Sequence, residues 1–176
     1  MAAIKRIFLM GFMCSGKTRI GQLLAERLGW TYMDTDASIV EETGMTISEI
    51  FEKQGEPVFR NLEKKWVAAS TRMDFYVISL GGGAVMDPDN WERISDTGLT
   101  ITLSYPPEIL AARLGRQSDR PLMRNIGGDE GVRRVAALLA KREPFYRKAD
   151  LVFHLNREVA AERVADALAG FVGEGI

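Results

Sequence analysis

Hydrophobic residues in this chain fall into two patterns, short unbroken apolar runs and longer stretches in which apolar positions recur every three or four residues. Runs of the first kind are typical of buried strands, and stretches of the second kind are typical of helices that bury one face. The runs predict five strands, at residues 7–10, 30–33, 76–80, 99–103 and 151–155.

Helical periodicity occupies most of the sequence between these strands. One apolar stripe covers residues 20–28 and ends at Gly29, a residue type that commonly follows a helix. Thr46 and Glu49 have the spacing of a capping box for a helix to about residue 54, and Pro57 suits the first turn of the next helix. Further helices are predicted after Pro88 and at residues 107–114, 132–142 and 159–172. Residues 115–128 have no steady period and predict a loop.

The alternation of strands and helices predicts an α/β fold. Right-handed crossovers between successive strands give a mostly parallel sheet with helices on both faces. Ligands of such sheets bind beyond the carboxyl ends of the strands, so functional motifs should directly follow a strand. At 176 residues the chain fits a single domain.

The first candidate motif is GFMCSGKT, at residues 11–18, which matches G-x-x-x-x-G-K-[ST] and lies between a predicted strand and a predicted helix. Its glycines let the backbone curl so that N–H groups point inward, where they can bind phosphate at a helix N-terminus. Lys17 can reach the outer phosphates, and the Thr18 hydroxyl can bind Mg²⁺. The motif therefore predicts a phosphate-binding loop.

Two carboxylates, Asp34 and Asp36, follow the second predicted strand. Residues two apart on an extended segment point the same way, so both can face the phosphate loop. One of them would then hold hydrated Mg²⁺, and the other would accept or orient the proton of an attacking hydroxyl. The alternative is that Asp36 only caps the following helix.

Gly81, Gly82 and Gly83 follow the third predicted strand, where the absence of side chains lets a ligand approach the backbone. A tight turn without a ligand is the alternative. Arg60, Arg120 and Arg142 carry no positional signal by themselves, and solvated arginine is the simpler interpretation of each.

Composition excludes several other classes of protein. One cysteine and one histidine rule out an internal disulfide and leave little for histidine chemistry or a multi-cysteine zinc site. A net charge of −1 argues against broad nucleic-acid binding. No apolar run is long enough for a membrane span, and the start of the chain lacks the apolar stretch of a secretory signal. We therefore expect a cytoplasmic monomer that binds neither nucleic acid nor membrane.

Taken together, GFMCSGKT, MDTD, GEPVFRNLE, SLGGGAV, RPL and KREPFYR resemble the corresponding segments of shikimate kinases, in order and spacing, over nearly the whole chain. The resemblance implies a P-loop fold of the nucleoside-monophosphate-kinase type. Its five-stranded parallel sheet would have the order 2-3-1-4-5, with substrate-binding helices at about residues 37–73 and a lid at about residues 115–128. The implied reaction is phosphoryl transfer from ATP to the 3-hydroxyl of shikimate, a step toward chorismate and the aromatic amino acids.

The same resemblance implies roles for individual residues. Asp36 would bind the shikimate hydroxyls and serve as the base. Arg60 and Arg142 would hold the carboxylate of shikimate, and the triple glycine would complete the pocket. The implied substrate-binding residues are Asp36, Arg60, Gly81, Gly82, Gly83 and Arg142. Arg120 would swing in with the lid and act with Lys17 and Asp36 as the catalytic set. Arg113 would stack on adenine. The implied ATP-binding residues are Gly11, Cys14, Ser15, Gly16, Lys17, Thr18, Arg19, Arg113, Arg120 and Arg157, and the implied Mg²⁺ ligands are Thr18 and Asp34.

Two other interpretations use the same loop. One is a different small-metabolite kinase, such as a gluconate or nucleotide kinase. The other is a GTP-driven switch, but the N-K-x-D and D-x-x-G segments of that class do not occur in the sequence. Cys14 departs from the shikimate kinases, which often have glycine there, and a thiol beside a helix N-terminus is expected to have a lowered pKa.

Overall fold

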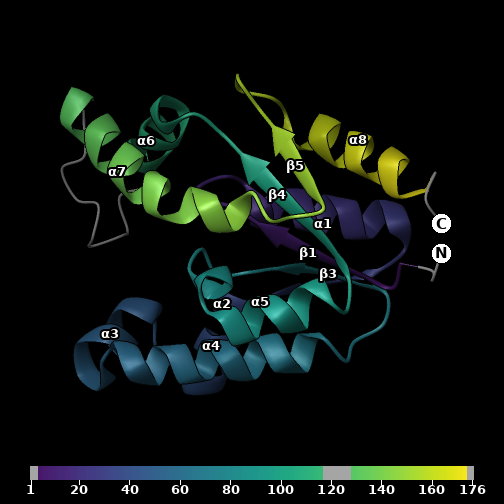
Figure 1. The fold of residues 1–176 in the computed structure, drawn as a ribbon, viewed down its shortest axis with the longest axis horizontal. Coiled ribbons are helices and arrows are strands. Elements are labelled where there is room, and N and C mark those ends of the chain that lie inside the picture. Colours follow the sequence, from purple (N-terminus) through teal and green to yellow (C-terminus); the bar gives the residue numbers. More distant parts are fainter. Residues whose placement is uncertain (1–3, 117–127, 174–176) are drawn as a thin grey trace.

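The computed structural model describes residues 4–116 and 128–173. Its sheet has five parallel strands in the order β2-β3-β1-β4-β5, which confirms the predicted topology. The strands are β1 (Arg6–Met10), β2 (Thr31–Asp34), β3 (Tyr76–Ser79), β4 (Leu99–Ser104) and β5 (Leu151–His154). Because all five run in one direction, the loops that follow them meet at one edge of the sheet (Figure 1).

The helices cover both faces of the sheet. They are α1 (Lys17–Leu28), α2 (Thr35–Thr43), α3 (Ile47–Gln54), α4 (Glu56–Ser70), the 3₁₀-helix η1 (Ala84–Met86), α5 (Pro88–Ser95), α6 (Pro107–Arg116), α7 (Gly128–Tyr146) and α8 (Ala161–Gly173). Right-handed crossovers put α1 and α8 on one face and the helices between β2 and β5 on the other, as Figure 1 shows for α1 and α8 against α4 and α5.

Local sequence explains several helix ends. The predicted capping box is present, since the Thr46 hydroxyl accepts from the backbone N–H of Glu49 and the Glu49 carboxylate accepts from the N–H of Thr46. Hydrogen bonds to Thr46 and then Lys53 lower the pKa of Glu49 to about 2. Gly29 ends α1 with a φ of 67°, a conformation that glycine adopts without steric cost.

Other boundaries differ from the prediction. β2 ends at Asp34, and α2 begins at once at Thr35. α7 runs over residues 128–146 instead of 132–142 and contains Pro144 near its end. Proline marks helix ends only on average, because packing can keep a helix intact past it. The flanks of the predicted lid are helical, and the rest of that segment lies outside the described residues.

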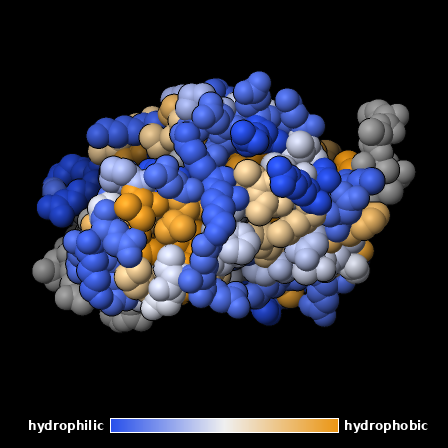
Figure 2. Space-filling model, turned by 90° about the horizontal axis from the view of Figure 1, so that it is seen from below, coloured by the Kyte–Doolittle hydropathy of each residue, from blue (hydrophilic) through white to orange (hydrophobic). Residues whose placement is uncertain are grey.

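The core lies on both sides of the central strands, where Ile7, Phe8 and Leu9 of β1 are fully buried. A second, smaller cluster of Ile39, Ile50 and Phe59 holds α2, α3 and α4 to one another. Seen from below, the molecule shows mainly hydrophilic side chains around smaller hydrophobic areas (Figure 2). Within residues 4–116 and 128–173, no helix is both long enough and apolar enough to cross a membrane.

Candidate active site

The predicted phosphate loop connects β1 to α1, as its motif requires. Three of its residues have positive φ: Gly11 at 141°, Cys14 at 62° and Gly16 at 87°. A side chain at Gly11 is excluded twice over, because a Cβ atom there would lie 2.6 Å from the carbonyl oxygen of Leu103 and 3.0 Å from Ser15 Oγ. The loop therefore curls against the end of β4, with its backbone amides at the N-terminus of α1.

Two side chains of this loop have the chemistry for phosphate binding. The Lys17 ammonium donates to the carbonyl oxygens of Gly11 at 2.9 Å and Phe12 at 3.1 Å, so its charge lies over the loop. The Ser15 hydroxyl is buried and has no hydrogen-bond partner among the described residues. A buried hydroxyl next to a ring of amides is suited to a bound anion.

Asp34 links the phosphate loop to β2 and α2. One carboxylate oxygen caps α2 by accepting from the N–H groups of Asp36 at 3.0 Å and Ala37 at 3.2 Å. The other oxygen accepts from the hydroxyls of Thr18 at 3.1 Å and Tyr32 at 3.2 Å. Asp34 and Thr18 thus place two hard oxygen donors side by side at the loop, a set that suits Mg²⁺ bound through few protein ligands and phosphates.

The expectation that residues 34–36 form one extended segment is wrong, because the chain turns into α2 at Thr35. The alternative that Asp36 caps the helix is also wrong, since the capping carboxylate belongs to Asp34. Asp36 lies in the first turn of α2, and its carboxylate does not accept the capping hydrogen bonds of that helix.

The Asp36 carboxylate lies against the triple glycine. A Cβ atom at Gly81 would be 2.6 Å from Asp36 Oδ1 and 2.9 Å from Glu63 Oε1. The Gly81 N–H donates to the Thr35 hydroxyl at 3.0 Å, which ties the glycine turn to the start of α2. Two carboxylates therefore occupy the space that a side chain at Gly81 would need.

Two arginines contact the rest of the turn. A Cβ atom at Gly83 would lie 2.9 Å from Arg60 Nη1, and one at Gly82 would lie 3.0 Å from Arg142 Nη1 and 3.7 Å from the Gly11 carbonyl oxygen. The Arg142 guanidinium also lies 5.4 Å from the ring centre of Phe12 in the phosphate loop. The structure thus brings both arginines and Asp36 to one glycine turn beside the phosphate loop, although α2, α4 and α7 carry them.

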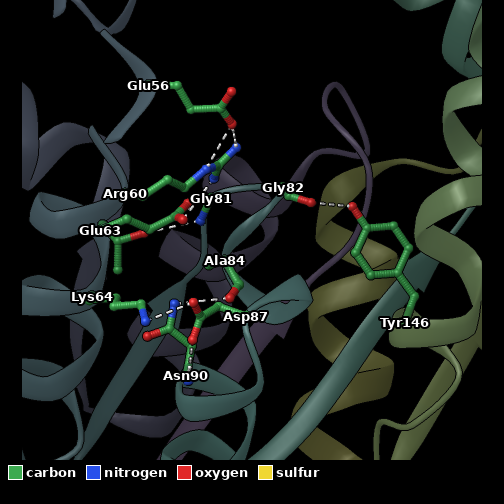
Figure 3. A network of polar contacts seen from close by, with 11 residues as sticks. Glu56, Arg60, Glu63, Lys64, Gly81, Gly82, Ala84, Asp87, Asn90 and Tyr146 are labelled. Carbon is green, nitrogen blue, oxygen red and sulfur yellow. Dashed lines mark hydrogen bonds and ion pairs between the residues drawn. The ribbon is translucent and has the colours of Figure 1, made fainter. Parts of the chain in front are cut away.

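The turn is also braced from both sides. The Tyr146 hydroxyl donates to the Gly82 carbonyl oxygen at 2.7 Å, and the Asn90 side chain donates to the carbonyl oxygen of Ala84 at 3.0 Å (Figure 3). Burial raises the pKa of Tyr146, partly offset by Arg142, so this phenol stays a hydrogen-bond donor near neutral pH.

Glu63 had no role predicted from the sequence, and the structure pairs it with Arg60. Its side chain is only 2% exposed and lies 2.8 Å from Arg60 Nη1, while Glu56 holds the other end of the guanidinium at 3.0 Å (Figure 3). Burial raises the pKa of Glu63, and the hydrogen bond and charge of Arg60 partly offset this rise. The signal was its position three residues after Arg60 on one helix, a spacing that brings side chains together.

Comparison with known proteins agrees with this geometry. A family model described as shikimate kinase matches residues 13–172. A shikimate kinase of Geobacter metallireducens is 39% identical over 172 residues, which span 98% of this chain and 92% of that protein. The chain belongs to the shikimate kinase family.

Solved structures of the shikimate kinase family have the same fold. The shikimate kinase from Acinetobacter baumannii in complex with shikimate matches with a TM-score of 0.88 and 32% identity, covering 98% of this chain and 94% of that chain. The shikimate kinase from Bacteroides thetaiotaomicron has a TM-score of 0.88 and 34% identity, covering 97% of this chain and 99% of that chain. The resemblance seen in the sequence is confirmed.

Four further arginines were expected at the nucleotide from resemblance to the shikimate kinase family. Arg19 is exposed and pairs with Glu162 at 3.0 Å. Arg113 donates to the carbonyl oxygen of Cys14 in the phosphate loop at 3.0 Å. Arg157 is exposed in the segment after β5, and Arg120 lies outside the described residues. Of the three described, only Arg113 contacts the loop in the hydrogen bonds that the structure shows.

One other hollow of the surface, of about 400 Å³, is lined by residues of α5 and its neighbours, among them Thr71, Glu92 and Thr97. Thr71 and Thr97 come shortly before β3 and β4, so this hollow lies at the amino edge of the sheet. Ligands of parallel sheets bind at the opposite edge, where the phosphate loop and the glycine turn lie.

Proposed function

We propose that the chain transfers the terminal phosphoryl group of ATP to the 3-hydroxyl of shikimate, giving shikimate 3-phosphate and ADP. The observation that carries this proposal is the shared position of Asp36, Arg60 and Arg142 around one glycine turn beside the phosphate loop. A base and a pair of carboxylate-binding arginines then lie next to a loop that can bind a triphosphate, which is the arrangement that a kinase for a carboxylated alcohol needs.

On the acceptor side, the two guanidiniums of Arg60 and Arg142 bind the carboxylate of the substrate. Arginine suits this task because its planar fork offers paired donors to carboxylate oxygens. The ion pair with the buried Glu63 holds Arg60 toward Gly83, so the remaining donors of Arg60 are positioned before the substrate arrives. Asp36 accepts a hydrogen bond from the reacting hydroxyl and takes its proton as the phosphoryl group transfers.

On the nucleotide side, the loop amides and Lys17 bind the phosphates. The Lys17 ammonium exchanges its carbonyl partners in the loop for phosphate oxygens, which bear more charge. Thr18 and Asp34 would hold Mg²⁺, and the bound ion would neutralise charge on the phosphates. We propose that Arg120 and the lid complete the nucleotide side of the site. Cytoplasmic location, monomeric state and the absence of nucleic-acid or membrane partners stay predictions.

A coupled assay of ADP release tests the substrate. We expect turnover with shikimate and little with gluconate or nucleoside monophosphates. Shikimate methyl ester, which keeps the hydroxyls and loses the charge, should show a KM raised by about 100-fold, since it forfeits the paired charge-assisted hydrogen bonds. Turnover with gluconate or a nucleotide and none with shikimate would overturn the substrate assignment.

A further inference from the structure

Arg113 contacts three other parts of the chain, two of which are distant from it in the sequence. From α6 its Nη1 donates to the Cys14 carbonyl oxygen of the phosphate loop at 3.0 Å, and its Nη2 donates to Glu158 Oε2 at 2.5 Å. Its Nε lies 3.2 Å from both oxygens of Glu158, which follows β5. The guanidinium also lies 4.1 Å from the ring centre of Tyr105, a buried residue at the end of β4. We call this group of Cys14, Tyr105, Arg113 and Glu158 the Arg113 clamp.

The loop residue in this clamp has an unusual backbone. Cys14 has a φ of 62°, in the left-handed region that residues other than glycine, asparagine and aspartate rarely adopt. Such a residue keeps this conformation only when its surroundings hold it. The hydrogen bond from Arg113 is made to the carbonyl of this same residue, so it acts on the peptide whose orientation is least favourable.

The orientation of Arg113 depends in turn on Glu158. The Arg113 side chain is 18% exposed, with one face on Tyr105, whereas the Glu158 side chain is 53% exposed and reaches the guanidinium from solvent. The hydrogen bond and charge of Arg113 lower the pKa of Glu158, so the pair is ionised at neutral pH. Glu158 fixes both the Nε and Nη2 edge of the fork, and this leaves Nη1 directed at the loop.

We propose that Glu158 is a positioning residue for nucleotide binding. It fixes the orientation of Arg113, and Arg113 in turn stabilises the left-handed backbone conformation of Cys14. The phosphate loop thereby keeps the conformation that binds the nucleotide. The inference rests on the proposed use of this loop for ATP. Without Glu158, a fraction of the molecules would relax at Cys14, and the apparent nucleotide affinity would fall by that fraction. Glycine at the same position would need no such support, because it adopts positive φ without strain.

The test measures the Kd of ADP by isothermal titration calorimetry in a double-mutant cycle. Glu158→Ala should raise the Kd by roughly three- to tenfold in the natural background. The same change combined with Cys14→Gly should leave the Kd within about twofold of Cys14→Gly alone. Glu158→Gln, which keeps one acceptor oxygen, should have a Kd between that of the unmodified protein and that of Glu158→Ala.

Asp166→Asn is the matched control, because Asp166 is an exposed carboxylate that pairs with Arg27 between α8 and α1, away from the loop. It should leave the Kd unchanged, which separates positioning from a general loss of surface charge. The three mutated residues, Cys14, Glu158 and Asp166, are exposed or partly exposed, and thermal unfolding checks that each variant folds.

Three results would overturn the proposal: an unchanged Kd in Glu158→Ala, an equal rise in both backgrounds, or tighter binding. Tighter binding would mean that Glu158 competes with the nucleotide for Arg113. Failure of the proposed function is distinct from these results, because it would appear as absent ADP binding in the unmodified protein.

Discussion

Replacing Gly81 with alanine places a methyl group where two carboxylates lie. The added Cβ would be 2.6 Å from Asp36 Oδ1 and 2.9 Å from Glu63 Oε1, whereas ordinary contacts of this kind begin near 3.4 Å. The Asp36 oxygen would therefore move by about 0.8 Å, and misplacement of about 1 Å at a reacting group can cost about 100-fold in rate. We predict that Gly81→Ala lowers kcat roughly 30- to 100-fold and leaves ADP binding intact, because the loop at residues 11–18 is untouched.

The assay is steady-state turnover with both substrates varied, together with calorimetric binding of ADP. Gly170→Ala is the matched control, because Gly170 lies in α8 with nothing within 4 Å of an added Cβ, and it should keep the kcat of the unmodified protein. Gly83→Ala would contact Arg60 instead, at 2.9 Å, and should raise the KM for shikimate more than it lowers kcat. If folded Gly81→Ala kept kcat within about threefold of normal, the assignment of Asp36 to the reacting hydroxyl would be wrong.

Three other predictions test neighbouring groups. Asp36→Asn should remove most turnover and preserve nucleotide affinity; near-normal turnover would exclude Asp36 as the base. Arg60→Ala should weaken shikimate binding and leave Glu63 buried without its cation, which raises the pKa of Glu63 further. A carboxyl group whose pKa is higher in the folded than in the unfolded protein destabilises the fold once it ionises. The free energy of unfolding lost in Arg60→Ala should therefore grow by about 1–2 kcal/mol from pH 5 to pH 8 in urea titrations, and a pH-independent loss would contradict this prediction. Alkylation of Cys14 should block activity and be slowed by ATP, and equal modification rates with and without ATP would refute this.

The sequence alone was sufficient for the sheet and for the phosphate loop. Apolar runs of four or five residues encode buried parallel strands locally, and the glycines and Lys17 of the loop act through their own backbone and their nearest neighbours. The same holds for the capping box of Thr46 and Glu49, whose two partners are three residues apart. Local chemistry of this kind leaves a local signal.

Other features of the site have partners that are far apart in the sequence. Asp34 was expected to point the same way as Asp36, but the chain enters a helix between them, and the two carboxylates reach different neighbours. The burial of Glu63 follows from the packing of α4 against the glycine turn, because its helical position alone fits an exposed residue equally well.

What the sequence determined by itself is the fold and the kind of chemistry, since repeating patterns along the chain dictate which faces are buried and which loops can hold phosphate. Only the tertiary structure decided which groups meet. The contact of Gly81 with Asp36, of Gly82 with Arg142, and of Arg113 with Cys14 each joins separate elements at the carboxyl edge of the sheet. Such contacts depend on strand order and helix packing, and no periodicity within either segment records them.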